Sequence, residues 1–312
     1  MTKYMKKQLK DRPELSIIIV SFNTKDLLQD CLNSLKKVKK EIPFEIIVSD
    51  NASKDGSVEF VKELSKKDKS IKLIENKKNL GFARGNNIAR KIARGEYVLF
   101  LNSDTKVHSK TLREAVEYLK AHKEVGSLTC KILLPDGSLD LDARRRFPTP
   151  LISFKRIFLG KYKDYWYLDR SADEIHEVDV IQGAFHLTRR KILNEVGWFD
   201  KDYFLDGEDV DLCWKIKQAG YKIVYYPVVS ITHVKKASKK RLRSSFAVTS
   251  GVRAMEIFYK KHLWERYPFF INYLVLFGVR FLLIMRLVKF NIQMYSYKFT
   301  SGVERCKAGV NK

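Results

Sequence analysis

The sequence predicts an α/β protein with a Rossmann-like, doubly wound and mostly parallel sheet, and three observations carry this prediction. Short aliphatic runs alternate with stretches whose apolar residues recur at helical spacing over residues 15–101. Such runs are typical of strands buried on both faces, and their alternation with helices is typical of a parallel sheet. Polar clusters at 21–24, 50–53 and 102–105 follow three of the runs, where ligands bind in sheets of this kind.

The individual elements follow from the same patterns in chain order. The first apolar run is Leu15-Ser16-Ile17-Ile18-Ile19-Val20, and apolar residues at helical spacing from residue 24 onward predict a helix after it. Residues 125–179 are less regular and rich in aromatic residues and arginine. The other predicted elements are strands at 44–48, 71–74 and 97–101, helices from 58 and over 83–93, a strand from 178–181 that runs on to 187, a helix over 208–219, and strands at 221–226 and 228–232.

Composition narrows the class of protein. In 312 residues, 45% are hydrophobic and 12% aromatic. This is enough for a core and argues against wholesale disorder. The formal charge of +24 favours anionic partners such as nucleotide phosphates, nucleic acid or acidic lipid. The four cysteines are scattered, which argues against a disulfide framework or a zinc site and fits a reducing compartment. The charged residues 1–11 contain no apolar segment, so we expect no signal peptide and a cytoplasmic protein.

The composition changes near residue 235. From there to the end the chain holds seventeen Lys or Arg against three Glu, together with an apolar segment over 267–288. Arg280 lies inside that segment, and a charge there costs about 2.5–3.5 kcal/mol on insertion scales. We therefore expect a helix that lies in the membrane interface; a spanning helix, or one packed on the catalytic domain, stays open. The expected domains are a charged tail (1–12), a catalytic domain (13–235, with halves 13–106 and 107–235) and a basic helical extension (236–312).

Two acidic groups are candidates for chemistry. Asp104 follows the predicted strand 97–101, where a carboxylate is well placed to bind a divalent cation, although it could also cap the helix expected near Ser109. Glu208, Asp209 and Asp211 crowd the start of another predicted helix. The helix dipole explains one or two of these acids, and a desolvated one could act as a general base.

Two further features are weaker evidence for a functional site. His233 ends a strand-like stretch, and a lone histidine is more often structural than a metal ligand. The loop 79–87 contains Gly81, Gly85 and Arg84, so its backbone can approach a ligand closely while the arginine pairs with phosphate or braces a carboxylate. The loop matches neither of the common glycine-rich nucleotide motifs.

Taken together, the segments resemble family 2 glycosyltransferases of the GT-A fold, and within them the rhamnosyltransferase-like branch. The resemblance covers residues 15–233, and Gly197-Trp198-Phe199-Asp200 precedes the last segment as it does in the family. The segments occur in the family's order: Ile18-Ile19-Val20-Ser21-Phe22-Asn23, residues 48–57, residues 79–87, Leu101-Asn102-Ser103-Asp104-Thr105, Gly183-Ala184-Phe185, and Gly207-Glu208-Asp209-Val210-Asp211-Leu212-Cys213-Trp214.

The resemblance implies an inverting transfer of a sugar, with rhamnose suggested by the branch, from a nucleoside-diphosphate sugar to an acceptor hydroxyl. Asp209, with Glu208 second, would be the catalytic base. Asp104 and His233 would bind Mg²⁺ or Mn²⁺, and Asn102 replaces the first acid of the family's D-x-D element, which removes one charge from the metal site. The nucleotide-sugar would lie against Asn23, Asp50, Asn51, Asn79, Gly81, Arg84, Asn87, Asn102, Ser103 and Asp104, and Trp198, Phe199 and Asp211 would lie on the acceptor side.

The resemblance also implies a biological role and a cellular location, and other functions stay open. A hexosyltransferase of this type would serve the synthesis of cell-wall or other cell-surface polysaccharide or of glycolipid, on a glycan or lipid-linked acceptor. The basic tail would hold it on an anionic membrane as a peripheral protein of the cytoplasmic face. The alternatives are a sugar nucleotidyltransferase and a non-catalytic nucleic-acid- or glycan-binding protein. We expect no nucleic-acid partner, because acids gather at the crevice and no nucleic-acid motif is present.

Overall fold

The structure is a computed structural model that describes residues 12–235 and 245–309. The chain divides into two compact units, 1–237 and 238–312, which are considered separately below. The expected tail 1–12 lies outside the described residues except for Arg12, and so does the start of the expected extension at 236.

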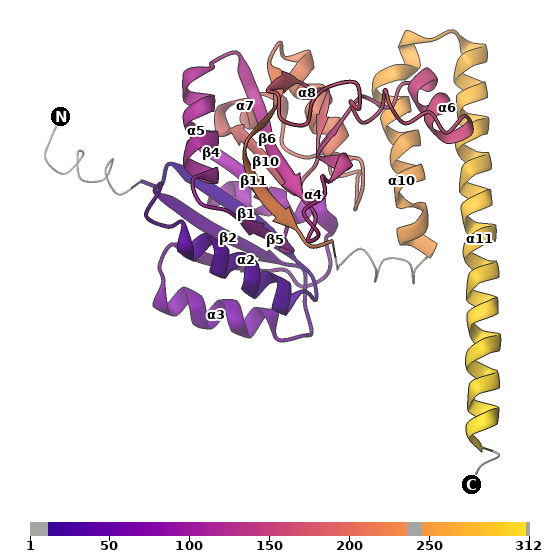
Figure 1. The fold of residues 1–312 in the computed structure, drawn as a ribbon, viewed down its shortest axis with the longest axis horizontal. Coiled ribbons are helices and arrows are strands. Elements are labelled where there is room, and N and C mark those ends of the chain that lie inside the picture. Colours follow the sequence, from indigo (N-terminus) through magenta and orange to yellow (C-terminus); the bar gives the residue numbers. More distant parts are fainter. Residues whose placement is uncertain (1–11, 236–244, 310–312) are drawn as a thin grey trace, which may run out of the picture. The chain divides into compact units, whose positions relative to one another are not determined.

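Nine strands of the described residues form one curled sheet in the first unit, in the order β3-β2-β1-β4-β10-β6-β11-β5, with β8 beside β11 (Figure 1). The pairs β1–β2, β2–β3, β1–β4 and β6–β11 are parallel, whereas β10, β5 and β8 run antiparallel to their neighbours. The strands are β1 (Leu15–Ser21), β2 (Phe44–Asp50), β3 (Ile71–Glu75), β4 (Tyr97–Leu101), β5 (Thr105–Val107), β6 (Val125–Leu133), β8 (His176–Glu177), β10 (Phe185–Arg189) and β11 (Lys222–His233), and a separate two-stranded sheet joins β7 (Arg144–Arg145) to β9 (Val180–Ile181).

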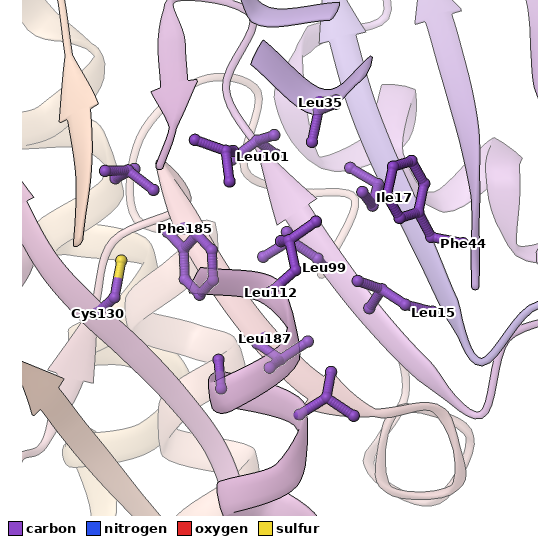
Figure 2. Close-up of a cluster of buried hydrophobic side chains, with 14 of the residues drawn as sticks. Leu15, Ile17, Leu35, Phe44, Leu99, Leu101, Leu112, Cys130, Phe185 and Leu187 are labelled. Carbon is purple, nitrogen blue, oxygen red and sulfur yellow. The ribbon is translucent and has the colours of Figure 1, made fainter. Parts of the chain in front are cut away.

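Helices cover both faces of the large sheet, as a doubly wound fold requires. On one face, Leu35 and Leu112 from two different helices point toward Ile17, Leu99 and other apolar strand residues (Figure 2). The opposite face is covered in part by the aromatic residues after α7, which pack on Phe100. The helices of this unit are α2 (Lys25–Lys37), α3 (Ser57–Lys67), α4 (Gly81–Ile88), α5 (Thr111–Ala121), α6 (Pro150–Phe158), α7 (Arg190–Val196) and α8 (Glu208–Gln218).

The predicted fold class is confirmed: this is an α/β protein with a mostly parallel sheet. Several element predictions were wrong. The helix expected over 83–93 is α4 followed by a 3₁₀ turn (Ala89–Lys91), and the strand expected from 178 to 187 is split between β9 and β10, which belong to different sheets. The strands expected on either side of Pro227 form one strand, β11, because a register shift between Tyr226 and Ser230 accommodates the proline.

The irregular region 125–179 contains β6, a nine-residue strand in the middle of the sheet. Its sequence mixes glycine, serine and threonine with apolar residues, so it lacks the aliphatic run that marks β1. Its side chains are nevertheless almost all buried, and β10 and β11 pair with its backbone on both sides. Residues 125–133 are therefore a strand because of their pairing with distant strands and not because of their local sequence.

The second unit contains α10 (Ser245–Phe258) and the long helix α11 (Phe269–Gly309). Between them the Tyr259 hydroxyl donates to Oδ1 of buried Asn272, whose amide group donates to the carbonyl oxygens of Trp264 and Tyr267. Within the described residues, Phe269–Met294 is the one helix whose length and composition would allow a membrane crossing, with a mean hydropathy of 1.9 and little burial. Arg280 is exposed among exposed apolar residues of this helix.

Candidate active site

The pairing of β5 with β11 brings Asp104 and His233 together. Thr105 lies opposite His233 in this antiparallel ladder, and the backbone N–H of Val234 donates to the carbonyl oxygen of Asp104 at 2.9 Å. As a result, Oδ1 of Asp104 is 3.2 Å from Nε2 of His233, and both side chains are buried. Asp104 does not cap the following helix, because α5 begins at Thr111 and has no side-chain cap.

A second carboxylate, Asp140, holds the other ring nitrogen of His233. Oδ2 of Asp140 lies 3.2 Å from Nδ1 of the histidine and accepts from Nε2 of Gln182 at 2.9 Å, while Oδ1 accepts from Nζ of Lys235 at 2.7 Å. Burial by itself raises the pKa of Asp140, but these donors hold it well below its ordinary value. Burial likewise opposes a charge on His233, yet the flanking carboxylates raise the pKa of the ring above its ordinary value.

This arrangement fits a divalent cation. Without a metal, the raised pKa favours a proton on Nε2, which donates to Asp104. A divalent cation would take the place of that proton, with Nδ1–H donating to Asp140 and the Nε2 lone pair facing the cation. Mg²⁺ holds ligands in octahedral geometry at about 2.1 Å, which places neighbouring ligand atoms about 3 Å apart. Within the described residues no group of three or more His, Cys, Asp or Glu side chains is arranged to hold a metal ion. The protein would therefore supply two ligands, and phosphate oxygens and water would supply the others, as is usual for Mg²⁺.

The predicted acids Glu208, Asp209 and Asp211 occupy the first turn of α8 and are all buried. Gly207, with φ of 90°, precedes the helix in the left-handed region that favours glycine. The positive end of the helix dipole stabilises carboxylates in this turn. Asp211 pairs with Lys215 one turn later, with Oδ2 3.0 Å from Nζ.

Asp209 forms a buried ion pair with Arg145 of β7. Oδ2 of Asp209 accepts from a guanidinium N–H at 2.5 Å, and Oδ1 accepts from the backbone N–H of Val210 at 2.8 Å. Burial alone lowers the pKa of Arg145, but the Asp209 charge raises it well above the ordinary value. The arginine thus fixes the carboxylate in place.

One short stretch of chain, the 140–145 segment, supports both groups of residues. It begins at Asp140, which contacts His233, and ends at Arg145, which contacts Asp209. Arg144 points the other way, over the ring of Tyr225 and toward the carbonyl oxygen of Ser171. This alternation is that of a β-strand, whose successive side chains lie on opposite faces.

On the donor side, Asp50 lies at the end of β2 and is buried. Its carboxylate accepts from the N–H of Ser53 at 2.8 Å and from the Ser53 hydroxyl at 2.7 Å. Asn23 has a positive φ of 52°, and its Oδ1 accepts from the N–H of Lys54 at 2.7 Å. The two residues expected at the nucleotide therefore join the loops after β1 and β2 into one rim.

The loop 79–87 is fastened at several points. The amide group of Asn51 donates to Oδ1 of Asn79 at 3.2 Å and to the carbonyl oxygen of Gly81 at 3.1 Å. Gly81 has φ of 78°, and a Cβ there would lie 2.1 Å from the carbonyl oxygen of Phe204. No larger residue fits at this position without a shift of the backbone. Asn87 exchanges two hydrogen bonds with the backbone of Phe199.

The other residues predicted at the nucleotide-sugar are Arg84, Asn102 and Ser103. Nε of Arg84 donates to the carbonyl oxygen of Lys201 at 3.3 Å. The backbone N–H of half-buried Asn102 donates to the carbonyl oxygen of Ala184 at 3.4 Å, and the Ser103 hydroxyl lies 3.1 Å from that of Thr24.

Trp198 and Phe199, named for the acceptor side, are buried in the core. Both rings pack against Phe100 of β4, at 5.8 Å and 4.5 Å between ring centroids. In this structure their side chains pack in the core, in the segment between α7 and α8.

Sequence reasoning missed three residues that touch the site, namely Asp140, Arg145 and Gln182. The first two fall in the region 125–179, which shows no clear periodicity. A signal was present there: acids at 140 and 142 directly precede Arg144-Arg145-Arg146, so opposite charges are concentrated in seven residues of an otherwise irregular region.

Residues 16–197, more than half of the chain, match the family model described as glycosyl transferase family 2. The chain belongs to this family. Its curated relatives include a poly-β-1,6-N-acetyl-D-glucosamine synthase of Staphylococcus epidermidis, 27% identical over 220 residues that cover 68% of this chain and 48% of the relative. The synthase of the same name from Staphylococcus aureus (strain MSSA476) is 24% identical over 241 residues, which cover 73% of this chain and 53% of the relative.

Solved structures of low sequence identity show the fold. The mannosyltransferase PcManGT from Pyrobaculum calidifontis, solved with GDP-Man and Mn²⁺, has a TM-score of 0.55 at 21% identity over 78% of this chain and 64% of that one. TarS 1–349 of S. aureus has a TM-score of 0.52 at 18% identity over 80% of this chain and 72% of that one. The fold is therefore GT-A. This chain spans about half the length of the curated relatives it matches.

Proposed function

We propose that this family 2 glycosyltransferase moves a hexosyl-type sugar from a nucleoside-diphosphate sugar to an acceptor hydroxyl, with inversion and with a divalent cation. The single observation that carries the proposal is the facing pair of Asp104 and His233, whose side chains lie 3.2 Å apart. The pair stands at the edge of the sheet where ligands bind in this fold class. The solved neighbours described with Mn²⁺ and a nucleotide or nucleotide-sugar support the proposal.

In this proposal Asp104 and His233 hold Mg²⁺ or Mn²⁺, and Asp140 orients the histidine. A bound cation would neutralise the charge that builds on the leaving diphosphate. Asn102 brings an amide where the family often has an acid, so the protein contributes one carboxylate to the metal. The rim formed by Asn23 and Asp50 would receive the base and ribose, and the fastened loop 79–87, with Arg84, would line the pocket.

Asp209 is the proposed base, with Glu208 the second candidate. A base on the face of the sugar opposite the leaving group takes the proton of the attacking hydroxyl, and a single displacement then inverts the anomeric centre. The Arg145 ion pair orients the Asp209 carboxylate before the acceptor arrives. An acceptor hydroxyl must reach the carboxylate alongside that arginine.

For the donor sugar and the acceptor we propose only a chemical class. Rhamnose follows from the resemblance to the rhamnosyltransferase-like branch, whereas the curated relatives are named for polymers of N-acetylglucosamine. Those names support a role in cell-surface polysaccharide synthesis. The basic, apolar extension after residue 235, with its exposed face on α11, supports a peripheral position on the cytoplasmic face of the membrane and a glycan or lipid-linked acceptor.

The first experiment is a thermal-shift screen of the full chain against UDP-, dTDP- and GDP-sugars, each with and without Mn²⁺ or Mg²⁺. A ligand that binds only the folded state adds about 2.7 kcal/mol at a hundredfold excess over its dissociation constant. We expect one nucleotide class to stabilise the protein only with the metal, and Asp104→Ala to lose that shift. A metal-independent shift that survives in Asp104→Ala would show that the metal assignment is wrong.

The second experiment measures turnover by the product released. The proposal requires a nucleoside diphosphate; release of pyrophosphate would identify a nucleotidyltransferase instead. We expect Asp209→Asn to lower kcat by about 10²–10⁴-fold with donor binding retained, and Glu208→Gln to lower it less. The reverse order of these two losses would transfer the role of base to Glu208.

A further inference from the structure

Helix α6 (Pro150–Phe158) is a complete helix with no buried residue. Its start is well specified, since the Thr149 hydroxyl accepts from the N–H of Ile152 and Pro150 occupies the first turn. Helices of this length are marginal in water and normally depend on the packing of one apolar face. The side chains of Leu151, Phe154 and Phe158 on this helix are each at least half exposed, so they are available to a further surface.

The apolar face of α6 continues into the chain that follows it. Leu151, Phe154 and Phe158 share one side of the helix by their spacing. The rings of the two phenylalanines lie 5.4 Å apart between centroids. Leu159 and Tyr162 come directly after; all five residues are between 47% and 62% exposed, and we call them the α6 patch. Five large apolar side chains exposed within twelve residues are typical of an interaction site.

The α6 patch is held in place by the residues beneath it. The guanidinium of Arg156 lies over the ring of buried Tyr165, 4.1 Å from its centroid. Nζ of Lys155 is 3.4 Å from Oδ2 of Asp164, and the N–H of Lys161 donates to the carbonyl oxygen of Lys155 at 3.0 Å. The helix and the chain after it thus form one fixed piece that presents the patch outward.

Positive charge borders the patch. Residues 150–170 contain five Lys or Arg and two Asp. Lys161 and Lys163 are exposed beside Tyr162. A short helix with aromatic and aliphatic side chains on one face and lysines at its border is complementary to the headgroup region of an anionic bilayer, where the rings enter the interface and the lysines meet lipid charge.

We propose that the α6 patch is a membrane contact of the catalytic unit itself, which inserts into the interface of an anionic bilayer. It stands on residues of the first unit, so it is independent of the membrane role proposed for α11. The patch begins six residues after Arg145, the partner of Asp209, and would therefore bring the base close to the bilayer surface. That last consequence rests on the proposed function, whereas the membrane contact does not.

The test uses an environment-sensitive fluorophore on the full chain. Cys31, Cys130 and Cys213 are buried, so a Cys306→Ser background leaves an introduced cysteine as the site to label. Phe154→Cys places the NBD fluorophore in the patch, and Lys67→Cys, exposed on α3 of the same unit, is the matched control. The vesicles are phosphatidylcholine with phosphatidylglycerol, and phosphatidylcholine alone.

We expect the fluorophore at position 154 to shift to the blue with anionic vesicles and to be quenched by spin-labelled lipid, while the fluorophore at position 67 does neither. An unchanged spectrum at position 154, while the chain sediments with the vesicles, would overturn the proposal and leave binding to the C-terminal unit. A fluorophore already shielded in dilute, lipid-free buffer would identify a contact within the chain, and a shift that grows with protein concentration would identify a second copy; either result also overturns it.

A charge variant tests the lipid chemistry. Each lysine near an anionic surface contributes about 1 kcal/mol, so Lys161→Glu/Lys163→Glu should raise the lipid concentration for half of the response at position 154 by at least about thirtyfold. Lys77→Glu/Lys78→Glu, which changes two exposed lysines of the same unit outside the patch, should leave it unchanged. Equal losses in the two variants, or an equal response to phosphatidylcholine alone, would show that the lysines of the patch do not select an anionic surface.

Discussion

Oδ1 of Asp104 lies 3.2 Å from Nε2 of His233 because β5 and β11 pair antiparallel, with Thr105 opposite His233. The ladder hydrogen bonds set this distance. The two side chains are held close before any ligand is present, so ligand binding need not gather them. Such preorganisation lowers the free energy that metal binding would otherwise spend on ordering side chains.

Asp140→Asn should weaken metal binding by about 10–100-fold, since loss of the carboxylate behind a ligating histidine has this effect in metal sites. Titration calorimetry with Mn²⁺, at fixed pH and with donor nucleotide present, measures the change without turnover. The matched control is Asp142→Asn, which also removes a charge beside Lys235 but does not contact His233. If both variants bind Mn²⁺ like the wild type, Asp140 does not position the ligand.

Arg145→Met should leave the Asp209 carboxylate buried without its partner. We therefore expect the free energy of unfolding to fall by about 3 kcal/mol, which urea unfolding measures. Asp209→Asn in the Arg145→Met background removes the stranded charge, so we expect the double variant to recover part of the stability. Additive losses in the double-mutant cycle would contradict a direct pair.

Gly81→Ala should disturb the junction between the loop 79–87 and the chain before α8, because its Cβ would meet the backbone of Phe204. The strained backbone adds about 1–3 kcal/mol of destabilisation. Gly137→Ala is the matched control: its φ is 85°, yet nothing lies within 4 Å of the added Cβ. Thermal unfolding of both variants separates the steric effect from the backbone effect, and equal melting temperatures would argue against the close contact.

His186 predicts an acid-sensitive fold. This histidine of β10 is fully buried against Phe100, and burial lowers the pKa of its ring to about 3. Between its unfolded pKa of 6.5 and pH 3 the unfolded chain binds a proton that the folded chain excludes. Stability therefore falls as pH falls through that range. At pH 5 the loss is about 2 kcal/mol.

His186→Phe keeps the apolar packing and removes the titration. Urea unfolding at pH 7 and pH 5 should therefore show a smaller loss of stability on acidification in the variant than in the wild type. Equal losses would place the acid sensitivity in other groups.

The first half of the fold could be predicted from the sequence because its signals are local. The aliphatic run of β1 and the helical spacing of α2 each stand on adjacent residues. The strand β6 could not, since its mixture of small polar and apolar residues gives no local signal and both of its pairing partners come from far along the chain. The two strands predicted at 221–226 and 228–232 are one strand, β11, because a bulge between Tyr226 and Ser230 accommodates Pro227.

The residues of the candidate site also differ in whether a local sequence pattern predicts them. Asp104 and Asp209 stand beside recognisable elements, so their positions at a strand end and a helix start were predictable. Asp140 and Arg145 act through residues 93 and 64 positions away, a separation that no local pattern reports. Asn51 and Asn87 were expected at the nucleotide from the family resemblance, yet much of their hydrogen bonding goes to fastening neighbouring loops.

The length of the 140–145 segment is a functional quantity. A 3₁₀ turn (Leu141–Ala143) separates Asp140, which contacts His233, from the two arginines of β7. Deleting one residue of this turn would break it, so Asp140 and Arg145 could not both keep their partners, His233 and Asp209. The residue count of the segment thus fixes the spacing between the two halves of the site.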